Sequence, residues 1–77
     1  MDTEMEYPIS NEAYNLLSVL TSKLEALGAY HIYLQDDMDD EARKAIEKVE
    51  ADDRQHVEFL IDQVEKHIRT YGLRPRK

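Results

Sequence analysis

The stretch AYNLLSVLTSKLEALGAYHIYL, residues 13–34, decides the fold. Its apolar side chains recur at intervals of three and four residues, which places them in one stripe along a helix. The stripe consists of Ala13, Leu16, Leu17, Leu20, Leu24, Leu27, Tyr30 and Leu34. Ser10, with Asn11 as the alternative, is placed to cap the helix because its side-chain oxygen can accept a bond from a free backbone N–H. The pattern predicts a first helix over residues 10–35.

A second apolar stripe follows a cluster of aspartates at residues 36–40. Aspartates cap helices, and their charge is favoured at the positive N-terminal end of the helix dipole. The stripe beyond them consists of Ala42, Ala45, Ile46, Val49, Val57, Leu60, Ile61, Val64 and Ile68. Gly72 and Pro75 then provide a glycine C-cap and a residue that does not continue a helix. We expect a second helix over residues 40–71.

These patterns predict a flexible arm at residues 1–9, a helical hairpin at 10–72 and a basic tail at 73–77. A short connection makes neighbouring helices antiparallel. A core built from 77 residues adds little stability by itself, and the absence of cysteine excludes disulfides, thiol catalysis and Cys-ligated metals. Each stripe is also wider than one neighbouring helix covers. We therefore expect an all-α fold, an antiparallel two-helix hairpin that dimerises into a ferritin-like four-helix bundle.

Charge and hydropathy exclude several classes of partner. The formal net charge of -7 at pH 7 argues against nucleic acid and anionic lipid. No apolar run approaches the roughly 18 residues of a membrane span, and the acidic N-terminus does not resemble a secretory signal. A cytoplasmic location is the expectation. Residues 69–77 carry four basic and no acidic groups, so this segment is either a frayed terminus or a docking segment for an acidic protein partner.

Polar residues interrupt the second stripe at its middle. Asp53 and His56 lie one turn apart at positions expected to face inward, and Glu50 lies nearly on the same face. A carboxylate and an imidazole at this spacing can share a metal ion, for which Glu50 and His31 are further candidate ligands. In a hairpin that turns near residue 38, Asp53 instead faces Lys23. The metal-free interpretation is then a polar layer in which Lys23 neutralises Asp53.

In that layer, Tyr30 and His56 complete the hydrogen bonds of Asp53. Buried ion pairs often add little net stability, but they can specify the register between helices. Acid-x-x-His also arises by chance in helices rich in acidic residues, and these side chains would then be merely solvated. The residues by themselves leave all three interpretations open.

Two runs carry a resemblance to a known family. They are Leu-x-Ala-Leu-x-Ala-Tyr, residues 24–30, and Asp-Asp-Arg-Gln-His-Val-Glu-Phe-Leu, residues 52–60. The chain resembles the ferritin-like helical hairpin, in particular the encapsulated-ferritin and rubrerythrin-like members, over about two thirds of its length. The resemblance implies two hairpins in one bundle and a di-iron centre that oxidises ferrous iron, with Tyr30, Asp53 and His56 at the family's tyrosine, glutamate and histidine positions. The glutamate position of the first helix falls on Lys23, whose ammonium group has no lone pair for iron.

We therefore predict a non-catalytic interaction or structural module that self-associates and needs no cofactor. Its polar core layer consists of Lys23, Tyr30, Asp53 and His56. The alternative is a ferritin-like di-iron protein, a ferroxidase or an iron-handling protein, with its ligands at the dimer interface.

Overall fold

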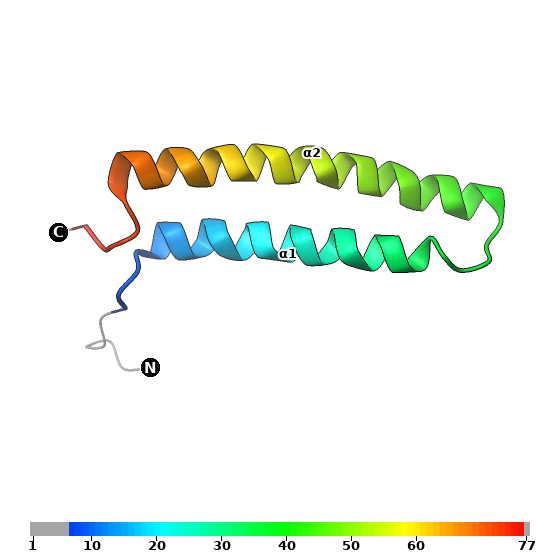
Figure 1. Ribbon diagram of the computed structural model, residues 1–77, viewed down its shortest axis with the longest axis horizontal. Coiled ribbons are helices and arrows are strands. Elements are labelled where there is room, and N and C mark those ends of the chain that lie inside the picture. Colours follow the sequence, from blue (N-terminus) through cyan, green and yellow to red (C-terminus); the bar gives the residue numbers. More distant parts are fainter. Residues whose placement is uncertain (1–6, 77) are drawn as a thin grey trace.

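The computed structural model describes residues 7–76 and shows two antiparallel helices side by side (Figure 1). Helix α1 spans Asn11–Tyr33 and helix α2 spans Asp40–Tyr71, and the described residues contain no strand. This confirms the predicted all-helical hairpin. Residues 1–6 of the expected arm and Lys77 of the expected tail lie outside the described residues.

Both helices begin at a side-chain cap. The N–H of Ala13 donates to Ser10 Oγ at 3.1 Å, and the N–H of Ala42 donates to Asp39 Oδ1 at 2.7 Å. Each cap therefore satisfies one of the backbone donors that the first turn of a helix leaves free. Asp40 and Glu41 add negative charge to the first turn of α2, where the helix dipole favours it.

Helix α1 ends at Tyr33, whereas the predicted helix extends to residue 35. The chain tightens there, because the N–H groups of Gln35 and Asp36 donate to carbonyls three residues earlier. Arg43, in the first turns of α2, donates to the carbonyl oxygens of Leu34 at 2.8 Å and Asp36 at 3.1 Å. The guanidinium group thus satisfies acceptors that the end of α1 leaves free, and it ties the loop to α2.

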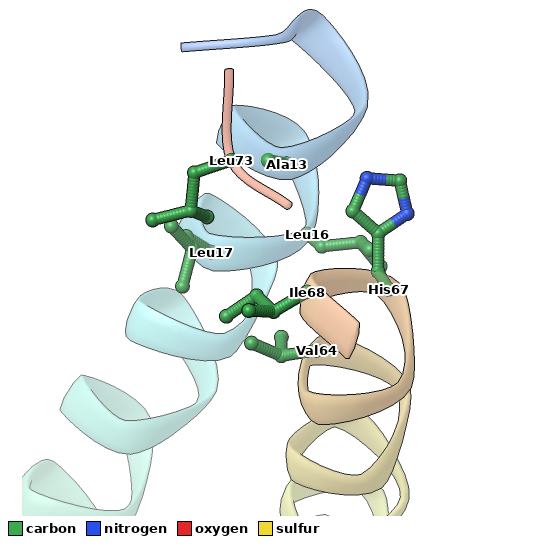
Figure 2. A pocket seen from close by; sticks show the side chains of 7 residues that line it. All are labelled: Ala13, Leu16, Leu17, Val64, His67, Ile68 and Leu73. Atoms are coloured by element: carbon green, nitrogen blue, oxygen red, sulfur yellow. The ribbon is translucent and has the colours of Figure 1, made fainter. Parts of the chain in front are cut away.

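The C-terminal segment turns back onto the start of α1. Gly72 adopts φ 75°, and its N–H donates to the carbonyl of Ile68 at 2.8 Å. The N–H of Ser10 then donates to the carbonyl of Leu73 at 2.8 Å. Figure 2 shows the Leu73 side chain beside Ala13 and Leu17, where these residues line a small apolar cavity between the helix ends. These contacts hold the C-terminal end of α2 against the N-terminal end of α1.

Few apolar side chains of the hairpin are completely covered, and most of those between the helices are partly exposed. Among the described residues, Ala13 and Val57 are the buried apolar side chains, and no large side chain is fully buried. Large apolar side chains such as Tyr33 and Phe59 are half or more exposed. Neither helix combines the length and the apolar character that crossing a membrane requires, within the part of the chain that the structure describes. The core is a single seam between two helices.

Candidate functional site

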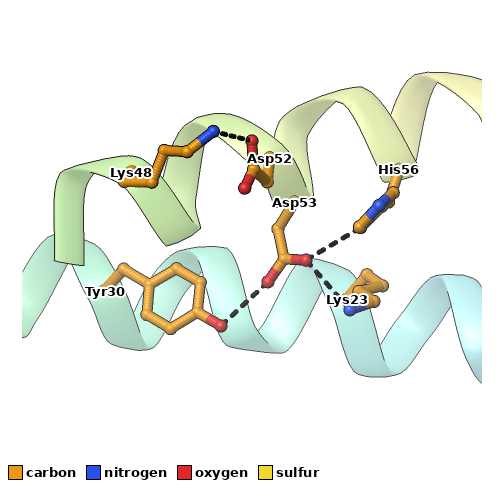
Figure 3. A network of polar contacts seen from close by, with 6 residues as sticks. All are labelled: Lys23, Tyr30, Lys48, Asp52, Asp53 and His56. Carbon is orange, nitrogen blue, oxygen red and sulfur yellow. Dashed lines mark hydrogen bonds and ion pairs between the residues drawn. The ribbon is translucent and has the colours of Figure 1, made fainter. Parts of the chain in front are cut away.

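Asp53, on α2, is the buried charged residue of the described chain, with 5% of its surface exposed. Lys23 Nζ lies 2.9 Å from Asp53 Oδ1, and the Tyr30 hydroxyl donates to Asp53 Oδ2 at 2.8 Å. His56 Nδ1 lies 3.1 Å from Asp53 Oδ1 (Figure 3). The structure thus brings Lys23, Tyr30, Asp53 and His56 together, and we call these four residues the polar layer.

Helix geometry explains why these four side chains meet. Lys23 and Tyr30 are two turns apart on α1, so both project toward α2. Asp53 and His56 are one turn apart on α2. The carboxylate of Asp53 therefore enters the seam between the two α1 residues, as Figure 3 shows. A short loop sets the antiparallel register that places residue 53 opposite residue 23.

The ionisation of the layer follows from its hydrogen bonds. The Lys23 ammonium group, aided by Tyr30 and His56, lowers the pKa of Asp53 from 3.8 to about 2. The pKa of Lys23 is raised, mainly because its charged form binds Asp53. The pKa of Tyr30 is also raised, because ionisation would remove the proton that its hydroxyl donates to Asp53. At neutral pH the layer therefore pairs one carboxylate with one ammonium group and a neutral phenol.

The polar layer is closed on one side and open on the other. The side chain of Asp53 is 8% exposed, whereas those of Lys23 and His56 are 36% and 59% exposed. Solvent therefore reaches the ion pair past Lys23 and His56, and screening weakens it relative to a dry pair. Lys48 and Asp52, 3.1 Å apart, form a separate pair on the outer surface of α2. The layer has an edge that another molecule can cover.

The remaining candidate ligands lie outside the layer. Glu50 pairs with Arg54 at 3.3 Å. His31 is exposed, and none of the polar contacts among the described residues joins it to Asp53. Residues 7–76 contain no group of three or more histidine, aspartate or glutamate side chains arranged to hold a metal ion.

The iron pair that the family resemblance implies requires carboxylate and imidazole ligands around each ion. Lys23 binds the Asp53 oxygen that a metal would need, and its protonated amine is a donor without a lone pair. Tyr30 occupies the second oxygen. The donor set of one chain therefore does not fit a di-iron centre.

No family model, curated protein or solved structure matches the chain. The ferritin-like resemblance therefore rests on residues 24–30 and 52–60 and remains an expectation.

Sequence reasoning missed a second polar cluster, where the start of α1 meets the end of α2. Arg76 Nη2 lies 2.8 Å from Glu12 Oε1, and its guanidinium group lies 4.1 Å from the ring centroid of Tyr71. His67 packs against Tyr71 at 5.1 Å between ring centroids, and its Nε2 atom is buried without a hydrogen-bond partner, 3.9 Å from Glu12 Oε1. No local signal predicts the contacts of Glu12 with Arg76 and His67, because they join opposite ends of the chain. They also show that the described part of the basic tail packs on α1.

Proposed function

We propose that the chain is a non-catalytic interaction module that self-associates into a four-helix bundle, with the polar layer inside the bundle. One observation carries this proposal: many large apolar side chains of the described hairpin remain more than a third exposed, and the apolar side chains between the helices, apart from the buried Ala13 and Val57, are only partly covered. Small domains without disulfides or metals commonly gain their remaining stability by oligomerisation. A second copy supplies the missing half of the core.

One side of the hairpin is suited to this contact. Side chains one turn from the polar layer on α1 and α2 share the side on which Lys23 and His56 are exposed. Apart from Asp52, which pairs with Lys48, these side chains are uncharged, and we call the uncharged ones the open face: Val19, Ala26, Tyr33, Val49 and Phe59. Val19 and Val49 are 48% and 46% exposed, and Phe59 is 61% exposed. An apolar surface of this kind that spans both helices marks a site of protein–protein contact.

The other side of the hairpin also exposes apolar side chains, among them Tyr14, Leu24 and Ile61. Its α2 flank carries charged residues at helical spacing, namely Glu47, Arg54, Glu58 and Glu65. Charged residues are depleted from the centres of interfaces, because burial costs them their hydration. We propose that a second copy covers the open face, because this side also includes the exposed edge of the polar layer at Lys23 and His56.

Within such a bundle the polar layer has a defined role. A second copy on the open face covers Lys23 and His56, which excludes the solvent that now reaches Asp53. The layer is compatible with burial because its ammonium and carboxylate groups already neutralise each other at 2.9 Å. A buried polar layer favours the register in which its groups remain paired. We infer a role in specificity rather than in catalysis.

The basic tail is not the segment that we propose for partner binding. Arg76 already binds Glu12 and stacks on Tyr71 within the chain. A protein partner for residues 69–77 would have to compete with these contacts.

Sedimentation and light scattering on the untagged chain test the proposal. We expect a species of twice the 9.1 kDa of one chain. A folded monomer at all concentrations would overturn self-association.

A second measurement tests the absence of metal chemistry. After incubation with ferrous iron under argon, elemental analysis should find no retained iron. Retained iron that is lost in Asp53→Asn and His56→Ala, but not in the matched control Asp52→Asn, would overturn the non-catalytic function and favour an iron protein.

A further inference from the structure

The charges of the hairpin are divided unevenly between its two ends. Lys23 lies near the middle of α1, and Asp53 and His56 lie near the middle of α2. The half toward the loop, residues 24–52, carries nine acidic and three basic residues. The half toward the termini, residues 1–23 and 53–77, carries eight acidic and seven basic residues. The loop end is therefore strongly acidic, whereas the charges of the terminal end nearly balance.

A twofold axis can join two open faces in two ways. An axis parallel to the helices places both loops at the same end of the bundle. An axis across the helices places the loop of each copy beside the termini of the other. Both arrangements keep neighbouring helices antiparallel, and both bring the two polar layers together when the helices overlap over their full length. They differ in which charges meet.

We propose that two copies pack with their lengths reversed, so that the acidic loop of each lies beside the termini of the other. This inference rests on the proposed self-association and adds which ends meet. The reversed arrangement places the exposed Asp36 and Asp37 near the exposed Arg69 and Arg74 of the second copy. The alternative brings two strongly acidic ends together, and juxtaposed like charges oppose association.

The polar layer favours a dimer in which the two copies overlap over their full length. In the reversed dimer α1 of one copy lies on α1 of the other, so the two Lys23 ammonium groups approach each other, but each remains paired with its own Asp53 at 2.9 Å and the two layers together bury no net charge. A displacement of one copy by one or two turns would set Lys23 against apolar side chains of the other open face. That displacement would leave the ammonium group desolvated without a new partner. The charges at the ends therefore select the length-reversed arrangement, and the polar layers limit how far one copy can be displaced along the other.

The chain has no cysteine, so single cysteines can carry spin labels for distance measurement by double electron–electron resonance. The label at Asp37→Cys reports which ends meet, because Asp37 is exposed in the loop. The 32 residues of α2 span about 48 Å at a rise of about 1.5 Å per residue. Two labels at residue 37 should therefore lie about 45 Å apart in the reversed dimer. In the same-end dimer they would lie within about 25 Å, since packed helix axes are about 10 Å apart.

Adjacent residues on α1 provide a matched pair that reports which side is covered. Ser22 is in the stripe of Val19 and Ala26, whereas Thr21 is on the other flank beside Leu17. Both positions are exposed and near the middle of α1. We expect a shorter distance between two labels at Ser22→Cys than between two labels at Thr21→Cys.

The outcomes separate the two proposals. A long distance at residue 37, together with a shorter distance at residue 22 than at residue 21, supports the reversed dimer. A short distance at residue 37 would overturn the reversed arrangement and leave self-association intact. A shorter distance at residue 21 would show that the other side is covered, and a monomer by light scattering would overturn both proposals. Increasing ionic strength provides an independent readout: it screens the repulsion between two acidic loop ends, so it should strengthen a same-end dimer more than a reversed one.

Discussion

Replacing Phe59 by serine tests the open face, and the expected loss of dimer affinity can be calculated from the exposed area of the Phe59 side chain. Phe59 is 61% exposed, so its ring adds little to the fold of one chain. Of the roughly 200 Å² of an aromatic side chain, about 120 Å² is thus available to a partner, worth about 3 kcal/mol at about 25 cal/mol per Å². A twofold dimer contains the residue twice. If half of that area is buried, Phe59→Ser costs the dimer about 3 kcal/mol, or about 100-fold in Kd.

Tyr14→Ser is the matched control for Phe59→Ser. Tyr14 is 60% exposed, but it lies with Leu17 and Thr21 on the other flank of α1. Sedimentation equilibrium should give a Kd about 100-fold higher for Phe59→Ser, with Tyr14→Ser close to the unmodified chain. Circular dichroism of each variant confirms that the hairpin remains folded. An equal effect of the two changes, or a larger effect of Tyr14→Ser, would refute the assignment of the open face.

Three further predictions concern the stability of the fold. Gly72 has φ 75° and ψ -169°, a region open essentially to glycine, so Gly72→Ala should lower the free energy of unfolding by about 1 to 3 kcal/mol in denaturant titrations; an unchanged value would contradict this. The pKa of Asp53 is lowered from 3.8 to about 2, so its stabilisation is present above pH 3.8 and is lost as pH falls through about 2. Acid titration of Asp53→Asn should therefore show a shallower loss of stability over this range, while Asp52→Asn retains the slope of the unmodified chain; equal slopes in the two variants would count against the ion pair. Asp39→Ala removes the cap that binds the Ala42 N–H and should cost about 1 kcal/mol, whereas the same change at Asp37, which caps neither helix, should cost much less in the same thermal melts.

The parts of the fold that depend on residues close together in the sequence could be predicted from the sequence alone. A helix period is repeated every few residues, and the Ser10 and Asp39 caps each act on a backbone N–H only three residues away. The proximity of Lys23 to Asp53 was also accessible, because a short turn near residue 38 makes the antiparallel register a matter of counting. For these features the physical cause lies within a few residues, or within one loop.

Contacts that depend on the rotation of each helix and on the distance between the two helices could not be predicted from the sequence. Arg43 stands four residues before Glu47, a spacing typical of a helix ion pair, yet it donates to the loop carbonyls of Leu34 and Asp36. The end of α1 at Tyr33 follows from the same loop geometry.

The sequence by itself determined two amphipathic helices, their caps and their antiparallel pairing, because periodicity and capping are local properties of the chain. Only the tertiary structure decided that His56 stands at the open edge of the layer, that Arg76 reaches Glu12, and that the apolar seam between the helices is so thin. The physical reason is the width of the two apolar stripes. Each stripe is wider than one neighbouring helix can cover, so the sequence pattern does not determine how each helix is rotated about its own axis. The side chains that are covered, and those left for a partner, are set when the two helices pack.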